Sequence, residues 1–257
     1  MKKRILGFLM LITLLFSLSS CNIFTKEYDD SNATVVKVST SLSKAVDKVY
    51  DSCVGIYCTD SSMSTASIGS GVIFKEDNGT YYVITNYHVV ESYVGSDSAK
   101  FYVYVGNTST RYRASLTAAL NSQKDLAVLT INPGRTLKTV SISKDYHPIV
   151  SVGENVFAIG CPISLDYFNS VCSGVVSKTE YTATNNNGDL KVIQNTCPIN
   201  PGNSGGGLFN MAGELIGLNF KKTTYVMEGS SKTLVDGLNY AISLNEVITH
   251  LIKYNLI

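Results

Sequence analysis

Short apolar runs separated by turn residues fill most of the chain from about residue 45 onward. The first six runs are 53–58, 70–75, 81–86, 101–106, 111–120 and 126–131, and after the stretch 132–148 six more follow at 155–160, 171–177, 190–195, 206–210, 214–220 and 238–243. Many short strands at regular spacing indicate a β-sandwich or β-barrel. Closing each set on itself would also remove its exposed edges. The sequence therefore predicts an all-β fold of two six-stranded antiparallel barrels, at about 50–132 and 150–243.

Two local signals refine this expectation. Asn78-Gly79 stands between two of the runs and is a strong signal for a two-residue hairpin turn. In the last stretch, Leu244, Val247, Ile248 and Leu251 recur at helical spacing, which predicts a C-terminal helix at about 244–255 that packs on the body.

The N-terminus predicts export. "MKKR" precedes the apolar run 5–18, which is shorter than the 18 or more residues of a membrane span and favours a removable signal at 1–20 over an uncleaved hydrophobic segment. "LSSC", ending at Cys21, resembles a bacterial lipobox. That resemblance implies cleavage before Cys21 and a lipid on its sulfur, which would hold the protein on the outer face of the cytoplasmic membrane. The polar segment 21–44 is then a tether, and 45–257 is the folded domain.

Charge and cysteine content exclude several classes. Without the expected signal about 237 residues remain with a net charge of about −2, which is not the balance of a nucleic-acid-binding protein. That length suits one two-barrel unit and leaves no room for a second regulatory domain. No zinc-type cysteine and histidine spacing is present, so neither a metal nor another cofactor is expected. Beyond the lipobox the cysteines are Cys53, Cys58, Cys161, Cys172 and Cys197. Their disulfide connectivity stays open, although Cys161 and Cys172 could close a hairpin.

One stretch, "NPGNSGGGLFN" at 200–210, suggests chemistry. Its hydroxyl, Ser204, is followed by three glycines, which favours a backbone with unusual dihedral angles or a close approach. A hydroxyl becomes a nucleophile only beside a base that a third group orients. Among the histidines, His147 and His250 fit surface roles, whereas His88 ends an apolar run and could also be a packed core residue. Asp125, at the entry to the run 126–131, is the carboxylate candidate, and a turn-capping role is its alternative.

His88, Asp125 and Ser204 occur in that order at intervals of 37 and 79 residues. Together with "GSGVIF" (69–74), "VITNYHVV" (83–90), "KDLAVL" (124–129) and "GELIGLNF" (213–220), this order resembles the trypsin-like serine peptidases, and most closely the HtrA (Deg-type) family. The resemblance implies a chymotrypsin-like fold in which His88 is the general base, Asp125 its orienting group and Ser204 the nucleophile. It also implies an oxyanion hole made by the backbone N–H groups of Gly202, Asn203 and Ser204.

The sequence departs from the trypsin pattern at two positions. Asn203 stands where trypsin has an aspartate that pairs with a newly cut N-terminus, so activation by cleavage is not expected. Control would instead come from the loops 161–170, 178–190 and 221–236, as in HtrA enzymes, although the PDZ domain typical of that family is not expected here. Pro198 stands where trypsin has its basic-specificity aspartate. Pocket walls from Pro198, Ile199, Leu218, Asn219 and Phe220 predict cleavage after small or medium aliphatic residues.

These observations favour a membrane-tethered, extracytoplasmic serine endopeptidase that acts on unfolded or misfolded exported polypeptides. The alternative is a catalytically idle surface lipoprotein that keeps the barrels as a protein-binding module, because fold does not fix function. A cysteine peptidase is disfavoured, since Cys197 lies seven residues before Ser204. Polypeptide substrates and the membrane, through the lipid, are the expected partners. The family resemblance adds a homotrimer as one expected assembly.

Overall fold

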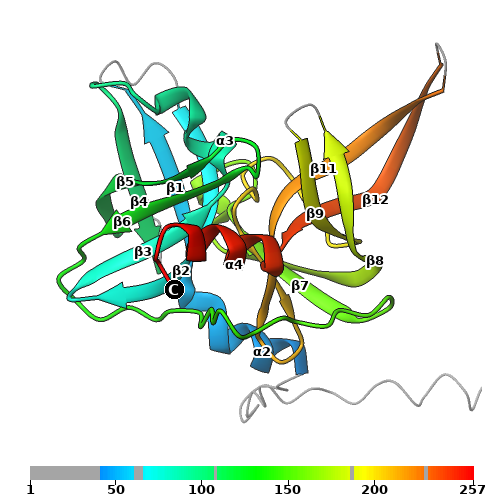
Figure 1. Ribbon diagram of the computed structural model, residues 1–257, viewed down its shortest axis with the longest axis horizontal. Helices are drawn as coiled ribbons and strands as arrows, with labels where there is room; N and C mark the ends of the chain where they lie inside the picture. The colour runs from blue at the N-terminus through cyan, green and yellow to red at the C-terminus, as the bar shows by residue number, and fades with distance from the viewer. Residues whose placement is uncertain (1–40, 61–65, 107–108, 186–187, 229–230) are drawn as a thin grey trace, which may run out of the picture. The chain divides into compact units, whose positions relative to one another are not determined.

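The computed structural model describes residues 41–60, 66–106, 109–185, 188–228 and 231–257, which all belong to one structural unit, Thr40–Ile257. The expected signal peptide, Cys21 and the tether as far as residue 40 lie outside the described residues. The described chain forms two closed antiparallel barrels, each of six strands (Figure 1). The predicted all-β, two-barrel fold is therefore confirmed.

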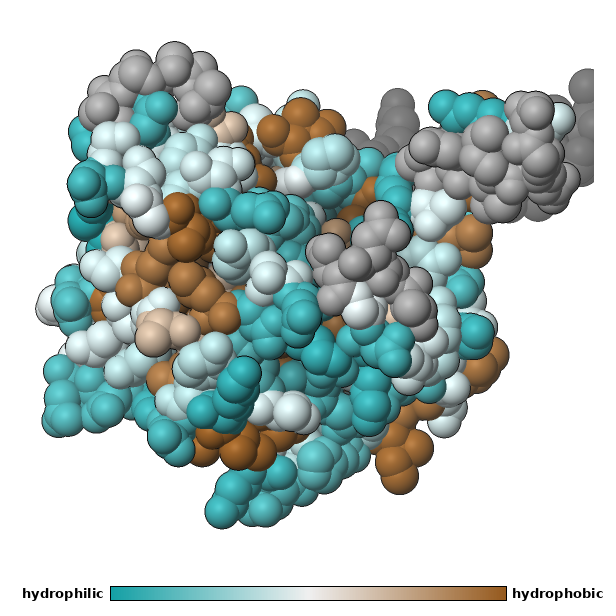
Figure 2. Space-filling model, turned by 45° about the horizontal axis from the view of Figure 1, so that its top comes forward, coloured by the Kyte–Doolittle hydropathy of each residue, from teal (hydrophilic) through white to brown (hydrophobic). Residues whose placement is uncertain are grey.

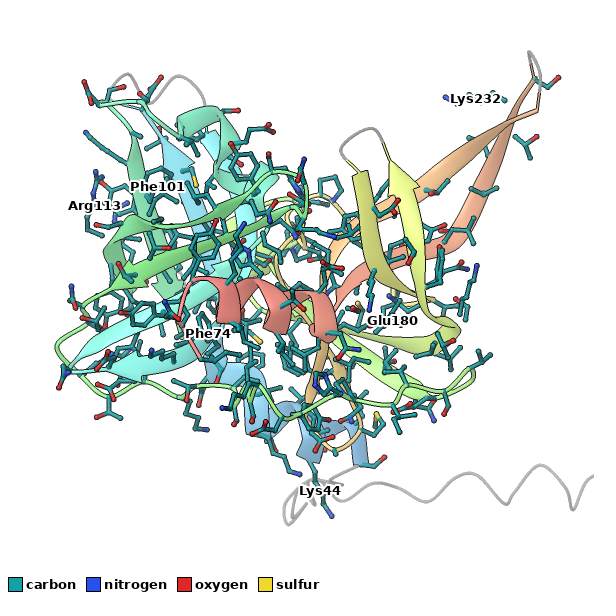
Figure 3. The ribbon with its side chains drawn as sticks, viewed as in Figure 1. Lys44, Phe74, Phe101, Arg113, Glu180 and Lys232 are labelled. Atoms are coloured by element: carbon teal, nitrogen blue, oxygen red, sulfur yellow. The ribbon has the colours of Figure 1, made fainter. Side chains whose placement is uncertain are left out.

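The first barrel contains six strands in the order β1-β2-β3-β6-β5-β4 and closes through the pairing of β1 with β4. Their bounds are β1 (Cys53–Thr59), β2 (Ala66–Asp77), β3 (Thr80–Thr85), β4 (Lys100–Val105), β5 (Arg111–Asn121) and β6 (Leu126–Ile131). Inside it, Phe101 is buried with residues such as Val103 and Leu129. Figure 3 shows Arg113 on the outer side of this barrel, as the alternation of side chains along a strand requires.

The second barrel has the order β10-β11-β12-β9-β8-β7 and closes through the pairing of β10 with β7. Its strands are β7 (Asn155–Gly160), β8 (Ser170–Asn185), β9 (Gly188–Asn195), β10 (Gly207–Asn210), β11 (Leu215–Glu228) and β12 (Ser231–Ser243). Phe157 and Phe209, from neighbouring strands, stack with ring centroids 5.3 Å apart. Their cluster includes buried residues of both barrels, among them Val72 and Leu126 from the first, so the two barrels share a core.

The expected turn at Asn78-Gly79 joins β2 to β3. Both residues have positive φ, 51° and 81°, and the flanking Asp77 and Thr80 are paired. Two central residues with positive φ make the type I′ geometry that suits a two-residue hairpin.

Helical segments connect and cover the barrels. The longest are α2 (Ser41–Val49) and α4 (Leu244–Lys253), and the shorter ones are η2 (Tyr50–Ser52), α3 (Tyr87–Val90), η3 (Glu91–Tyr93) and η4 (Leu165–Tyr167). Ser243 is the N-cap of helix α4, and its side chain accepts a hydrogen bond from the N–H of Glu246. The helix follows β12 of the second barrel, yet Tyr254 just beyond it donates to the Leu120 carbonyl of β5. The C-terminal helix thus ties one barrel to the other.

Several sequence expectations need correction. Residues 41–44, assigned to the tether, form the first part of α2, whose Ala45 and Val49 are buried. The expected loops 178–190 and 221–236 are largely strand, because β8, β11 and β12 run far beyond the apolar runs that predicted them. Lys232 lies near the end of the β11–β12 hairpin, which projects away from its barrel (Figure 3).

His250 is also not a surface residue. Its side chain is buried, its Nε2 lies 3.3 Å from the Ala119 carbonyl oxygen, and burial lowers the pKa of its imidazole below the ordinary value of 6.5. His147 is exposed as expected, and its Nδ1 lies 2.8 Å from Oδ1 of Asn245.

The face drawn in Figure 2 is covered mainly by hydrophilic residues, with hydrophobic side chains in separate patches. Within the described ranges, no helix combines the length and apolar character needed to cross a membrane.

Candidate active site

His88 and Asp125 are joined by two hydrogen bonds. Asp125 Oδ2 lies 2.8 Å from His88 Nδ1, and Asp125 Oδ1 accepts a hydrogen bond of 2.9 Å from the backbone N–H of His88. The aspartate side chain is 19% exposed, whereas that of the histidine is 42% exposed. The carboxylate therefore fixes both the position and the tautomer of the ring, because Nδ1 must carry the proton that the carboxylate accepts. Nε2 is left free to accept a proton on the other side.

Local structure delivers both residues. His88 lies in α3, the single helical turn directly after β3, and Asp125 is the last residue before β6, which pairs with β3. Asp125 has φ of 51°, in the left-handed region that aspartate tolerates better than most residues. Its carbonyl accepts a hydrogen bond of 3.0 Å from the side chain of Asn86, which also holds the turn to the end of β3.

Ser204 lies in a tight turn before β10. The N–H of Asn203 donates to the Asn200 carbonyl at 3.0 Å, and Pro201 and Gly202 occupy the two central positions. Gly202 has φ of 95°, and a Cβ at this position would overlap the Cys161 carbonyl oxygen. Only glycine fits here, which explains one of the glycines that surround Ser204.

The Ser204 turn packs directly against the part of the first barrel that carries His88. The N–H of Ser70 in β2 donates to the Ser204 carbonyl at 2.8 Å. Gly205 is so close to the end of β3 that a Cβ on it would overlap the Thr85 hydroxyl and lie 3.1 Å from the backbone nitrogen of Asn86. The hydrogen bonds of the described residues join His88 to Asp125 but do not include one from Ser204 to His88. Catalytic hydrogen bonds are often long in unliganded sites and shorten when substrate binds.

Two backbone N–H groups at the Ser204 turn are available to donate hydrogen bonds to a negatively charged oxygen. Throughout the described part of the chain, the N–H groups of Gly202 and Ser204 donate to no other protein group. The Asn203 N–H, which the sequence analysis counted with them, is instead used to close the turn. The oxyanion hole expected from three N–H groups therefore reduces to two, those of Gly202 and Ser204.

The residues of the expected substrate pocket lie in different environments. Pro198 is exposed and Ile199 is buried, whereas Leu218 belongs to the shared core. The side chain of Asn219 is also buried and donates to the carbonyls of Gly206 and Gly207 at 3.1 and 3.2 Å. It therefore holds the backbone that follows the Ser204 turn. A bulge between Asn219 and Lys221 breaks the strand alternation.

Phe220 packs against the same hydrophobic cluster that contains Leu218. Phe220 is half-buried and lines a cavity of about 200 Å³. The other residues of the cavity are Tyr181, Ala183, Leu190, Val192, Lys221, Thr223 and Tyr240. Of the five expected pocket residues, Phe220 is the one that lines this cavity.

The described cysteines are all unbridged, including Cys161 and Cys172, which the sequence analysis considered as a pair. Cys172 instead donates to the Pro198 carbonyl at 3.3 Å, and its interaction with Cys197 lowers the pKa of Cys172 and raises that of Cys197. Burial raises the pKa of the Cys58 thiol to about 12, which keeps this thiol protonated and unreactive. No group of three or more potential metal-ligating side chains occurs among the residues that the structure describes.

The sequence analysis missed one residue of this region, Ser70. Its motif "GSGVIF" was recognised, but a small residue between two glycines on a predicted strand gave no sign of the hydrogen bonds that its hydroxyl makes. Those bonds join segments 91 and 132 residues away in the chain, to Cys161 and Gly202.

Comparison with known proteins agrees with this geometry. A trypsin-like peptidase domain matches residues 69–218. The serine protease Do-like HtrA of Lactobacillus helveticus is 34% identical over 235 residues, which cover 88% of this chain and 54% of the relative. The protein of the same name from Bacillus subtilis is 38% identical over 198 residues, 75% of this chain and 40% of the relative. A probable periplasmic serine endoprotease, DegP-like, from Pseudomonas savastanoi is 39% identical over 160 residues, covering 62% and 30%.

The two closed barrels, with a carboxylate-held histidine on the first and a glycine-flanked serine just before β10 of the second, have the architecture of a trypsin-like peptidase domain. The chain belongs to the trypsin-like peptidase family, and the relatives described above are HtrA and DegP-like proteases. It spans about half the length of the first of these relatives.

Proposed function

We propose that this chain is a membrane-tethered, extracytoplasmic serine endopeptidase that hydrolyses unfolded or misfolded exported proteins with His88, Asp125 and Ser204. The observation that carries the proposal is the pair of hydrogen bonds that the Asp125 carboxylate accepts from His88, at 2.8 and 2.9 Å. A carboxylate that only capped a turn would have no reason to hold an imidazole ring in this way.

In the proposed reaction, Ser204 Oγ attacks the scissile carbonyl while His88 Nε2 takes its proton. The negative charge that develops on the carbonyl oxygen is stabilised by the free N–H groups of Gly202 and Ser204, and each such donor is worth about 2.7–4 kcal/mol. His88 then gives the proton to the leaving amine, and the scissile C–N bond breaks. Water attacks the acyl-enzyme while His88 takes its proton, and the ester bond to Ser204 Oγ breaks as His88 returns the proton to the serine. Asp125 stays ionised and stabilises the imidazolium throughout.

The substrate class is supported by the names of the relatives, which are serine proteases and endoproteases. Cleavage after small or medium aliphatic residues remains part of the proposal. Pro198 offers no acidic group to attract a basic side chain, and the half-buried Phe220 favours an apolar one.

The location is proposed from two arguments. The DegP-like relative is described as periplasmic, and the lipobox-like Cys21 supports a lipid anchor on the outer face of the membrane. A homotrimer is proposed from the family resemblance alone.

Digestion of fluorescein-labelled casein tests the proposed activity. The purified wild-type chain should release soluble fluorescent peptides, and Ser204→Ala should not. The competing function, a binding module without turnover, predicts a folded wild type that binds casein but leaves it intact. Metabolic labelling with palmitate, with Cys21→Ser as the control, tests the anchor separately.

A further inference from the structure

Ser70 lies in the middle of β2, in the first barrel, and only 1% of it is exposed. Its surroundings belong mainly to the other barrel. The backbone of Gly160, at the end of β7, is so near that a Cβ there would lie 2.9 Å from the Ser70 hydroxyl oxygen. Ser70 is thus a residue of one barrel embedded in the other.

Four hydrogen bonds converge on this single residue. Its hydroxyl lies 2.8 Å from the N–H of Cys161 and 2.6 Å from the carbonyl oxygen of Gly202. Its backbone N–H donates to the Ser204 carbonyl at 2.8 Å, and its carbonyl accepts from the Thr85 hydroxyl at 2.7 Å. These bonds link Ser70 to the end of β3 and to the Ser204 turn.

The donor sense of the hydroxyl is fixed by its partners. The Cys161 N–H can only donate, so the Ser70 oxygen accepts there, and its one hydrogen must point to the Gly202 carbonyl. Both partners are backbone groups, and Cys161 is fully buried. Donation from the hydroxyl at 2.6 Å therefore holds the Gly202 carbonyl in one direction.

The bonds of Ser70 fix two peptide groups of the Ser204 turn, those that follow Gly202 and Ser204. The peptide before Gly202 is fixed independently, because the Pro201 carbonyl accepts a hydrogen bond of 2.6 Å from the N–H of Ile163. The free N–H groups of Gly202 and Ser204 therefore belong to a backbone that is held on both sides. Charge stabilisation depends on donors that do not need to reorient during the reaction.

We propose that Ser70 is a positioning residue, whose hydroxyl keeps the backbone of the Ser204 turn in the orientation that aims the Gly202 and Ser204 N–H groups at the substrate oxyanion. This inference rests on the proposed endopeptidase function and adds to it a residue that does not touch the substrate. It predicts a defect in the chemical step and not in substrate binding.

The test compares Ser70→Ala with Ser52→Ala. Ser52 is a fully buried serine whose hydroxyl has no hydrogen-bond partner among the described residues, so its loss controls for removing a buried oxygen. Casein hydrolysis is measured over a range of substrate concentrations, and kcat is divided by the number of sites that an excess of a fluorophosphonate titrates. Ser70→Ala should lower kcat per titrated site about 10- to 100-fold, less than the 10²–10³-fold loss of an oxyanion donor itself. KM should stay within about twofold and the pH profile should keep its shape, since His88 and Asp125 are untouched.

A kcat per titrated site within about twofold of wild type would overturn the proposal, because the variant would then have lost only folded protein. Should Ser70→Ala fail to fold, Ser70→Cys, which replaces the hydroxyl by a larger thiol that hydrogen-bonds weakly, is measured in the same way and should show the same loss. Amide hydrogen exchange of residues 200–206 provides a readout that needs no turnover. Faster exchange in the variant supports the holding role, and unchanged exchange contradicts it. A wild type that neither cleaves casein nor takes the label would refute the proposed function, and the exchange result would then decide the role of Ser70 alone.

Discussion

Replacing Asp125 with asparagine should separate the role of the carboxylate from that of its shape. The backbone N–H of His88 is an obligatory donor to Asp125 Oδ1, so the amide oxygen of the asparagine must take that position. The amide NH₂ group then faces His88 Nδ1, which lies 2.8 Å from the other oxygen in the wild type. Because an NH₂ group can only donate, Nδ1 must become an acceptor and the ring proton must move to Nε2. In that tautomer Nε2 cannot accept the proton of Ser204.

The expected loss in kcat is about 10⁴-fold, the cost of the same change in a Ser-His-Asp triad, or about 5 kcal/mol of transition-state stabilisation. Stability should change far less. Asparagine tolerates the positive φ of residue 125 as aspartate does, the bond to the backbone N–H of His88 survives, and the bond to Nδ1 is reversed. Even complete loss of a hydrogen bond to a charged group would cost only about 1.5–3 kcal/mol, which leaves a domain of ordinary stability folded.

The assay is the initial rate of casein hydrolysis, with urea unfolding of the same preparation. Asp145→Asn, at an exposed loop position, is the matched control and should keep wild-type activity. Activity of Asp125→Asn within about tenfold of wild type would refute the tautomer argument. So would a loss of activity that merely follows the loss of folded protein.

Two further substitutions test the packing and the electrostatics. Gly205→Ala should lower the free energy of unfolding by about 3 kcal/mol or more, because the φ of Gly205 is 82° and a Cβ there would overlap the backbone of β2. Gly153→Ala should lower it by only about 1–2 kcal/mol, because Gly153 has φ of 85° but open space around it. Both are measured by urea titration, and equal losses would contradict the packing argument. The wild type should lose stability as the pH falls below about 6.5, because burial lowers the pKa of His250 and the unfolded chain then binds a proton that the folded chain refuses. His250→Gln should flatten this slope in unfolding titrations between about pH 5 and 8, His147→Gln should not, and the opposite pattern would contradict the assignment.

The sequence predicted the barrels well because strand positions depend on local patterns. Apolar runs bounded by turn residues marked all twelve strands, and Asn78-Gly79 marked its hairpin. The lengths of β11 and β12 could not be predicted in the same way. Their outer halves pair mainly with each other, as in the pairing of Glu228 with Ser231, and so carry little of the apolar pattern that core contacts impose.

The errors in the candidate site have specific causes. Three of the expected pocket walls, Leu218, Asn219 and Phe220, are consecutive residues whose burial depends on contacts between strands, and the structure buries the first two. His250 was placed at the surface because a polar residue on a helix usually faces water. In the fold, α4 lies against β5 of the other barrel, and the ring packs on Tyr254 with centroids 5.0 Å apart. The role of Ser70 depends on contacts between distant segments, which no local pattern contains.

The most direct measurement of the central claim is the mapping of a fluorophosphonate probe on the purified wild-type chain by tandem mass spectrometry. The proposed mechanism predicts one modified residue, Ser204, and a strong decrease in the labelling rate in His88→Ala. A probe bound at another serine, or a folded wild type that takes no label at all, would contradict it.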